Sequence, residues 1–246
     1  RALFADLLRA VGAVPGIRRV RYTSPHPKDF RADVAEAMAE TEAVCEHLHL
    51  PLQSGSDTIL AAMHRGYTAD RYLARLAEAR SHIDDLAVTT DIIVGFPGET
   101  EDDFTRTLEV AAEAGYDSAY TFIYSPRPGT EAAELTDRFV DRAVVGERFD
   151  RLRAVIDRST RIRHEARVGR VETALVEGPS PRDPGAFTAR TRQNKLVHVE
   201  SSDHPPVGAL ADVRVTRAGT HSLRGDLVEI VADPPRRRTR IPVVAG

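Results

Sequence analysis

The chain has 246 residues, of which 41% are hydrophobic and 29% charged, a balance typical of a folded globular protein and unlike that of disordered or fibrous chains. With 34 Lys and Arg against 37 Asp and Glu, the net charge of −3 excludes a broad positive field, so any contact with nucleic acid must be local. The single cysteine, Cys45, excludes an internal disulfide and fits a reducing compartment, and no apolar stretch approaches the roughly 18 residues of a membrane span.

The first two thirds of the chain predict strands and helices in alternation. The opening residues 2–8 are already in helical period, so we expect the chain to be cut from something longer. Ser56, Thr68 and Thr100 can each cap a helix, and a long helical pattern covers residues 141–167. Four segments are predicted as strands: residues 19–23, 47–52, 87–94 and 118–124. This alternation predicts a parallel sheet with right-handed crossovers, in the manner of a βα barrel.

The arginines of the long helix scatter around its circumference. They favour a solvated surface, and an RNA-binding stripe is the alternative. The residues are Arg151, Arg153, Arg158, Arg161, Arg163 and Arg167.

The pattern changes to short strands after Gly169. Five runs of β type follow, at residues 171–175, 187–191, 196–199, 213–216 and 227–231, which predicts a small barrel of OB or SH3-like size. The fold class is therefore α/β: a partial βα barrel over residues 1–168, then a small all-β barrel over residues 169–232. Residues 233–246 contain adjacent prolines and an arginine run, so we expect a flexible tail.

The loops that follow the predicted strands are the expected location of a ligand site, because βα barrels gather their active sites there. Gln53, Ser54 and Asp91 are suitable hydrogen-bonding partners for an uncharged or zwitterionic ligand. Residues 95–98 fit a ligand-binding loop and, equally well, a tight turn into a capped helix. His26, between two prolines, is either a ligand or base or, more in keeping with a rigid loop, a structural residue.

Other catalytic motifs are absent. The sequence contains neither a Gly-x-Ser-x-Gly elbow nor a Gly-x-x-x-x-Gly-Lys phosphate loop. His47 and His49 point the same way on a strand and could bind a metal, but no further ligand has characteristic spacing, which favours core packing.

Two basic turns stand out in the predicted small barrel. The first is the hairpin with Arg190, Arg192, Gln193, Asn194 and Lys195, and the second is residues 222–225 with Arg224. Such turns can hold a nucleic-acid backbone, and ordinary solvated hairpins are the alternative.

The loops and turns together resemble the radical S-adenosylmethionine methylthiotransferases, most closely the tRNA-modifying branch. The matching stretches occur in the family's order and cover about residues 1–231: residues 21–27, 48–56, 89–100 and 122–130, then 175–178, 190–197 and 222–225, which look like the TRAM domain that ends these enzymes.

The resemblance implies the following chemistry. Such enzymes reduce S-adenosylmethionine at a 4Fe-4S cluster and, with a second 4Fe-4S cluster, add a methylthio group to C2 of N6-isopentenyladenosine beside the anticodon. The protein binds, orients and shields the reactants. A reductant protein is implied as a partner, and neither DNA nor a membrane is.

Site residues can be carried over from the same resemblance. Gln53, Ser54, Asp91 and Gly95 would bind S-adenosylmethionine, and Arg127 would face the barrel mouth. The residues implied to contact tRNA are Arg190, Arg192, Asn194, Lys195 and Arg224. Catalytic residues cannot be assigned.

One departure from the family is large. Its N-terminal domain with three cluster cysteines and its Cys-x-x-x-Cys-x-x-Cys segment are missing, and Cys45 cannot replace six thiolates. We therefore expect this chain alone to hold no iron–sulfur cluster and to be inactive. The alternatives are a sister enzyme that acts on a ribosomal protein or on threonylcarbamoyladenosine in tRNA and, from another class, a non-catalytic RNA-binding protein.

Overall fold

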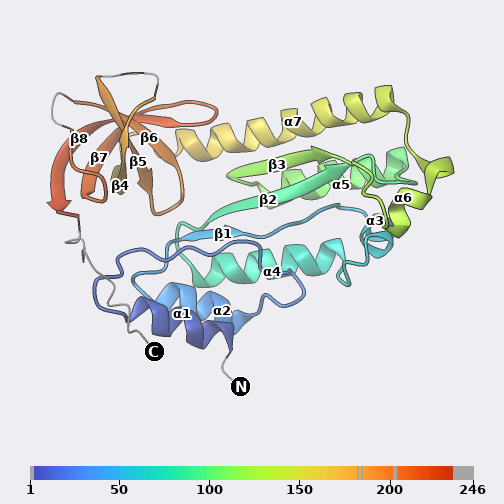
Figure 1. Cartoon of the computed structure of the whole chain (residues 1–246), viewed down its shortest axis with the longest axis horizontal. Coiled ribbons are helices and arrows are strands. Elements are labelled where there is room, and N and C mark those ends of the chain that lie inside the picture. The colour runs from blue at the N-terminus through green and yellow to red at the C-terminus, as the bar shows by residue number, and fades with distance from the viewer. Residues whose placement is uncertain (1–2, 182, 184, 202–203, 235–246) are drawn as a thin grey trace, which may run out of the picture. The chain divides into compact units, whose positions relative to one another are not determined.

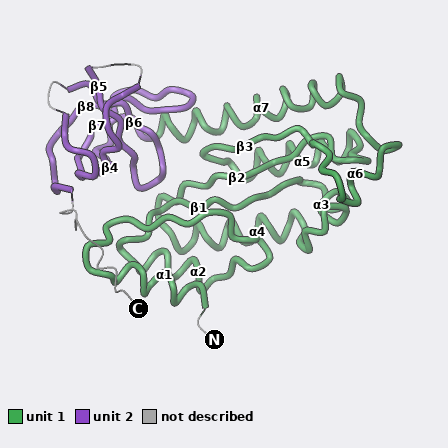
Figure 2. Tube along the Cα trace, viewed as in Figure 1, with its two compact units in different colours: residues 1–166 green, residues 167–246 purple. Residues whose placement is uncertain are grey.

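The computed structural model of the chain describes residues 3–181, 183, 185–201 and 204–234. Two compact units divide at residues 166 and 167 (Figure 2). The expected fold class, an α/β segment followed by a small β barrel, is confirmed. In the part of the chain that is described, no helix has the length and apolarity needed to cross a membrane. Most of the expected tail, from residue 235 onward, lies outside the described residues.

The first unit is a three-stranded parallel sheet with helices (Figure 1). The strands lie in chain order. The segment predicted as a strand at residues 19–23 forms only an isolated bridge, from Val20 to Val44. In chain order the elements are α1 (Phe4–Gly12), α2 (Ala32–Glu40), β1 (His47–His49), α3 (Asp57–Ala62), α4 (Ala69–His82), β2 (Ala87–Val94), α5 (Glu101–Ala114), β3 (Ser118–Ile123), α6 (Glu131–Glu134), a 3₁₀ turn (Thr136–Arg138) and α7 (Arg142–Glu165).

The predicted helix caps are confirmed. The hydroxyl oxygens of Ser56, Thr68 and Thr100 each accept a hydrogen bond from the backbone N–H three residues later. In turn, the Asp103 carboxylate accepts a hydrogen bond from the Thr100 N–H, which completes a capping box. Because these caps satisfy otherwise unpaired N–H groups, the helices after the first two strands start at defined positions.

The two faces of the sheet have different environments. In β2, Val88, Ile92 and Val94 are fully buried in a core to which helices α4, α5 and α7 contribute. The alternate residues of β2 point to the opposite face, where the register places Tyr120 beside Asp91 and Phe122 beside Ile93. Tyr120 is 63% exposed and Phe122 50%. This open face carries the polar groups of the candidate site.

The second unit is a closed five-stranded barrel with the order β4-β5-β6-β8-β7. The strands are β4 (Val171–Pro179), β5 (Ala186–Thr191), β6 (Leu196–Glu200), β7 (Leu210–Ala218) and β8 (Leu223–Ala232). The β6–β8 pair is parallel and the other pairs are antiparallel. At Gly225 an added Cβ would lie 2.6 Å from the carbonyl oxygen of Arg214, so only glycine permits this close approach of β8 to β7.

Candidate functional site

Two adjoining cavities lie where the strands of the first unit end. Each has a volume of about 510 Å³, within the range of small-molecule sites. They share five lining residues, Gln53, Ile93, Phe96, Thr130 and Ala132, and therefore form one continuous hollow. We call the part beside the end of α3 the outer cavity and the part over β2 and β3 the sheet cavity.

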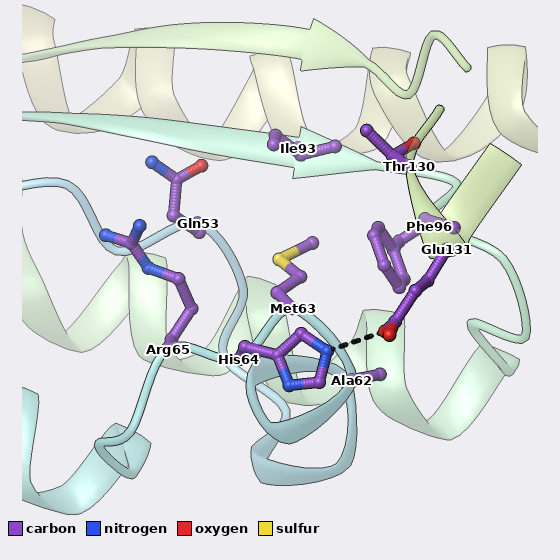
Figure 3. Close-up of a pocket in the computed structure, with 10 residues that line it drawn as sticks. Gln53, Ala62, Met63, His64, Arg65, Ile93, Phe96, Thr130 and Glu131 are labelled. Carbon is purple, nitrogen blue, oxygen red and sulfur yellow. Dashed lines mark hydrogen bonds and ion pairs between the residues drawn. The ribbon is translucent and has the colours of Figure 1, made fainter. Parts of the chain in front are cut away.

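The outer cavity is polar at its rim (Figure 3). Gln53 and Arg65 lie next to each other and supply an amide and a guanidinium group. Across the opening, Nε2 of His64 lies 3.0 Å from Oε2 of Glu131 and so links the end of α3 to α6. Both of these side chains are largely exposed, so this ion pair contributes little stability.

The sheet cavity combines a carboxylate with aromatic walls. Asp91 lines it together with Phe122 and Tyr124, while Arg127 lies at its exposed edge. The ring of Tyr124 packs edge-on against that of Phe96, at 5.3 Å between centroids. The Tyr124 hydroxyl is buried and has no hydrogen-bond partner within the described residues, so it can pair with a water or with a ligand atom in the cavity.

A row of polar side chains occupies the open face of the sheet, on which Asp91 also lies. His47 and His49 on β1 both reach the hydroxyl of Thr89 on β2, at 3.0 Å from His47 Nε2 and 2.9 Å from His49 Nδ1. The other ring nitrogen of His49, Nε2, lies 3.3 Å from Oδ2 of Asp91. In the described residues no three His, Cys, Asp or Glu side chains are grouped as metal ligands. The polar row therefore ends on a carboxylate that faces the cavity.

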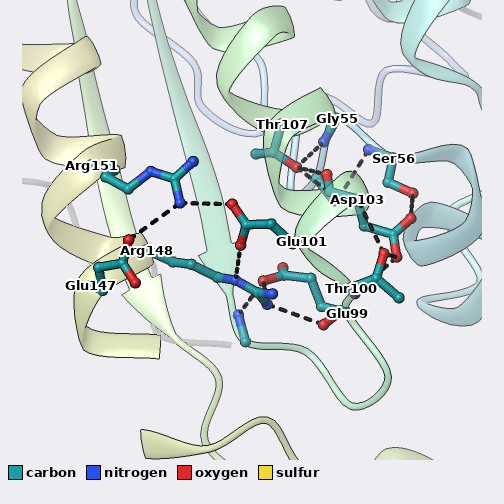
Figure 4. Close-up of polar contacts among 12 residues, drawn as sticks. Gly55, Ser56, Glu99, Thr100, Glu101, Asp103, Thr107, Glu147, Arg148 and Arg151 are labelled. Atoms are coloured by element: carbon teal, nitrogen blue, oxygen red, sulfur yellow. Dashed lines mark hydrogen bonds and ion pairs between the residues drawn. The ribbon is translucent and has the colours of Figure 1, made fainter. Parts of the chain in front are cut away.

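The turn that follows β2, residues 95–99, is held in place by a buried ion pair (Figure 4). Glu99 is 5% exposed, and its carboxylate accepts hydrogen bonds from Arg148 of α7 at 2.9 Å and from the Gly95 N–H at 3.2 Å. Arg148 also donates to the Glu99 carbonyl and to Glu101. Burial raises the pKa of Glu99, and the hydrogen bond from Gly95 and the charge of Arg148 oppose this effect.

The four residues expected to bind the cofactor fall into two pairs. Gln53 lines both cavities and Asp91 lines the sheet cavity. Ser54 lines neither: it is fully buried, with its hydroxyl 3.3 Å from that of Thr107. Gly95 also lines neither cavity. It has φ of +77°, and an added Cβ would lie 2.6 Å from Val145, so the backbone at this position requires a glycine.

His26 has the surroundings of a structural residue. Its Nδ1 accepts from the Lys28 N–H at 3.2 Å, and its ring packs edge-on against Tyr67, at 5.5 Å between centroids. Burial, and then the charge of Arg65, lower its pKa.

The basic turns of the barrel contain both paired and buried cations. Arg190 forms a two-pronged ion pair with Glu177, at 2.6 and 3.0 Å, and donates to the carbonyl of Asn194. Asn194 adopts φ of +63°, which makes the hairpin turn. Lys195 is only 5% exposed. Arg192 is half-buried, as is Arg190, whereas Arg224, which pairs with Glu200 at 2.8 Å, is exposed.

Several site residues were not identified from the sequence. Arg65 follows a short helix, far in sequence from the strand ends, and Phe96 and Tyr124 could equally have been core residues. Arg148 is one of many arginines on α7, and nothing in the spacing distinguishes it. Only a prediction of which loops meet in space could have found them.

Comparison with known proteins agrees with this architecture. Residues 2–111 match the family model of the radical SAM superfamily, and residues 165–228 match that of the TRAM domain. Coproporphyrinogen III oxidase (HemN) from Escherichia coli, a radical SAM enzyme of known structure, aligns with a TM-score of 0.49 and 17% identity over 78% of this chain and 46% of that one, a likeness too weak to carry a conclusion.

Three relatives that align with more than nine tenths of this chain carry the name tRNA-2-methylthio-N(6)-dimethylallyladenosine synthase. The protein from Ralstonia nicotianae is 48% identical over 93% of this chain and 51% of its own length. The corresponding values are 46%, 92% and 50% for Moorella thermoacetica, and 49%, 98% and 48% for Acidothermus cellulolyticus. The chain therefore spans about half the length of these relatives.

Proposed function

Because the chain belongs to the radical SAM methylthiotransferase family, we propose that it is part of an enzyme that adds a methylthio group to an adenosine of tRNA. The observation that carries the proposal is the similarity itself, 46–49% identity across both units to relatives that share one name. That name points to N6-dimethylallyladenosine, also called N6-isopentenyladenosine, and we propose C2 of this base beside the anticodon as the position modified.

The hollow at the strand ends fits S-adenosylmethionine. Phe96, Phe122 and Tyr124 supply apolar walls for the adenine ring, and the buried Tyr124 hydroxyl supplies a hydrogen-bonding group. Asp91 is suited to the ammonium or the ribose hydroxyls, and Arg65 with Gln53 to the carboxylate. When bound, S-adenosylmethionine would supply the radical and the methyl group; these residues bind it, orient it and exclude water.

The residues present do not fit an iron–sulfur cluster. A 4Fe-4S cluster needs at least three thiolates, and the sequence contains only Cys45, which is 1% exposed. We propose that the ligands for both clusters, and contacts for a reductant protein, come from polypeptide beyond this chain. The activity therefore belongs to the complete enzyme.

The barrel supports tRNA as the partner. It matches the TRAM domain, and Arg192, Asn194 and Arg224 are the residues that we propose contact the backbone of the anticodon loop. Because the substrate is tRNA, we also propose a cytoplasmic location.

Methyl transfer by the complete polypeptide tests the proposal. The reaction would contain S-adenosylmethionine with a tritium-labelled methyl group and either tRNA carrying N6-isopentenyladenosine or the same tRNA without it. We expect label in the first tRNA alone. Label in a ribosomal protein, or in threonylcarbamoyladenosine tRNA, would assign the chain to a sister enzyme, and no transfer with retained tRNA binding would leave a non-catalytic RNA-binding protein.

A further inference from the structure

The polar row on the open face of the sheet has a defined hydrogen-bond direction. It runs from His47 Nε2 to Thr89 Oγ1 (3.0 Å), from Thr89 Oγ1 to His49 Nδ1 (2.9 Å) and from His49 Nε2 to Asp91 Oδ2 (3.3 Å). The side chain of His49 is 9% exposed and that of Asp91 is 24% exposed, so the row leads from the core to the cavity. Each link joins β1 to β2, which are parallel neighbours.

The protons in this row can be assigned from Asp91 backward. An ionised carboxylate only accepts hydrogen bonds, so His49 must carry a proton on Nε2. In neutral His49 the other nitrogen, Nδ1, is then an acceptor, and the single hydroxyl proton of Thr89 must point to it. The Thr89 oxygen can then accept the Nε2–H of His47. For neutral His49 beside an ionised Asp91, a single arrangement therefore satisfies all three hydrogen bonds of the row.

We propose that His49 is a positioning residue, which holds the carboxylate of Asp91 toward the cavity, and that Thr89 fixes the tautomer of His49. The ring of Tyr120 packs edge-on against His49, at 6.1 Å between centroids, and shields the pair on its open side. The ligand group that Asp91 would meet is a hydroxyl or an ammonium, which rests on the proposed use of S-adenosylmethionine.

A metal ion is the competing explanation for the His-x-His pair. Nε2 of His47 and Nδ1 of His49 both lie within hydrogen-bond distance of the Thr89 hydroxyl oxygen, so these two nitrogens already have a partner. In the described residues, no three His, Cys, Asp or Glu side chains are arranged to hold a metal ion together. The geometry therefore favours a hydrogen-bonded row.

The tautomers can be measured directly in the purified chain. Two-bond ¹H–¹⁵N correlation spectra of ¹⁵N-histidine-labelled protein distinguish Nε2–H, Nδ1–H and doubly protonated rings, and the signals of His49 and His47 are assigned by their loss in His49→Gln and His47→Gln. We expect both rings in the Nε2–H form at neutral pH. An Nδ1–H form or a doubly protonated ring at His49 would overturn the proposal.

Variants at Thr89 separate the hydroxyl from the shape of the side chain. Thr89→Val keeps the branched shape that suits a strand and removes the donor, whereas Thr89→Ser keeps the donor. We expect His49 to become a mixture of tautomers in Thr89→Val and to remain Nε2–H in Thr89→Ser. An unchanged Nε2–H form in Thr89→Val would show that Thr89 has no such role.

Binding of S-adenosylmethionine to the chain, measured by equilibrium dialysis, tests the positioning role. The side-chain amide of His49→Gln can replace the Nε2 donor, so we expect affinity within about threefold of wild type, whereas His49→Leu should lose about tenfold. Equal affinity of His49→Leu and wild type would overturn the proposal. Absence of binding to the wild-type chain would count against the proposed cofactor site and not against the tautomers, which do not depend on ligand.

Discussion

Arg148 and Glu99 form a buried ion pair, 2.9 Å between Nη1 and Oε1, with side chains only 5% and 1% exposed. Replacing Arg148 by Met would leave the Glu99 carboxylate buried without its cation. We expect the free energy of unfolding to fall by about 3–5 kcal/mol, measured by urea titration followed by circular dichroism. Arg151→Met, which removes an exposed partner of Glu101, is the matched control and should cost no more than about 1 kcal/mol. Equal decreases in the two variants would show that the buried pair has no special role.

The same pair predicts a pH dependence of stability. Because burial raises the pKa of Glu99 above its ordinary 4.5, the folded state binds a proton more readily than the unfolded state. Protonated Glu99 therefore contributes its full stabilisation of the folded state below pH 4.5. This contribution is lost as the pH rises through the pKa that Glu99 has in the folded state. We expect the unfolding free energy of wild type to fall relative to that of Glu99→Gln over this range, by at most about 1.4 kcal/mol per pH unit.

Glu101 is a control of opposite sign for this pH prediction. Its hydrogen bond from Arg151 lowers its pKa, so its contribution is present above the ordinary pKa and is lost as the pH falls. Urea titrations of wild type, Glu99→Gln and Glu101→Gln from pH 4 to 7 check both signs. A difference between wild type and Glu99→Gln that does not vary with pH would contradict the assignment.

Asp91 and Ser54, both expected at the cofactor site, should respond differently to mutation. Asp91→Asn removes the charge that lines the cavity, and we expect affinity for S-adenosylmethionine to fall by about tenfold, or about 1.4 kcal/mol. Ser54→Ala removes a buried hydroxyl next to Thr107, so it should cost about 1–3 kcal/mol of stability and leave affinity unchanged. Equilibrium dialysis and urea titration of both variants would reveal the reverse pattern if Ser54 bound the ligand.

Binding of tRNA should depend on the accessible cations of the barrel. For each phosphate that Arg192→Ala or Arg224→Ala no longer neutralises, the slope of log affinity against log salt should decrease by about 0.7–0.9. Lys195→Ala should mainly lower stability, because this side chain is buried. Arg106→Ala, on the surface of the first unit, is a charge-matched control. Fluorescence anisotropy over a salt series measures the slopes, and slopes equal to the control would contradict the assignment.

The count of thiols predicts that the chain binds no cluster by itself. After anaerobic incubation with iron and sulfide, followed by desalting, we expect far less than one iron per chain. Stoichiometric iron with a cluster absorption band would refute this expectation. The Cys45→Ser variant shows whether any residual iron is held by the single thiol.

Local signals in the sequence predicted most of the secondary structure. Strand β2 has the predicted bounds, and each predicted cap at Ser56, Thr68 and Thr100 is present, because caps and alternation are set by neighbouring residues. The strand expected at residues 19–23 is only a bridge at Val20, because a strand also needs a neighbouring segment with which to pair, and the local sequence does not specify that segment.

The candidate site was less predictable because it depends on contacts distant in sequence. Asp91 and Gln53 could be expected at the strand ends, whereas the neighbours of Ser54 and Gly95, which carry the same motif signal, are Thr107 of α5 and Val145 of α7 and could not be read from spacing. On α7, an arginine expected in solvent can carry a structural bond, as Arg163 does to the Gly115 carbonyl at 3.1 Å. Periodicity gives the direction of a side chain and not its partner.

Gln53 has φ of +67°, a conformation that costs a residue with a side chain on the order of 1 kcal/mol and a glycine almost nothing. Two backbone hydrogen bonds to β2, from Gln53 N–H to the Asp91 carbonyl at 2.8 Å and from Ile93 N–H to the Gln53 carbonyl at 2.9 Å, hold it there. Glycine would make this position more stable, so the chain sacrifices stability to keep an amide at the mouth of the hollow. A search for thermostable variants would select glycine at residue 53 and in doing so would remove an amide that lines both cavities.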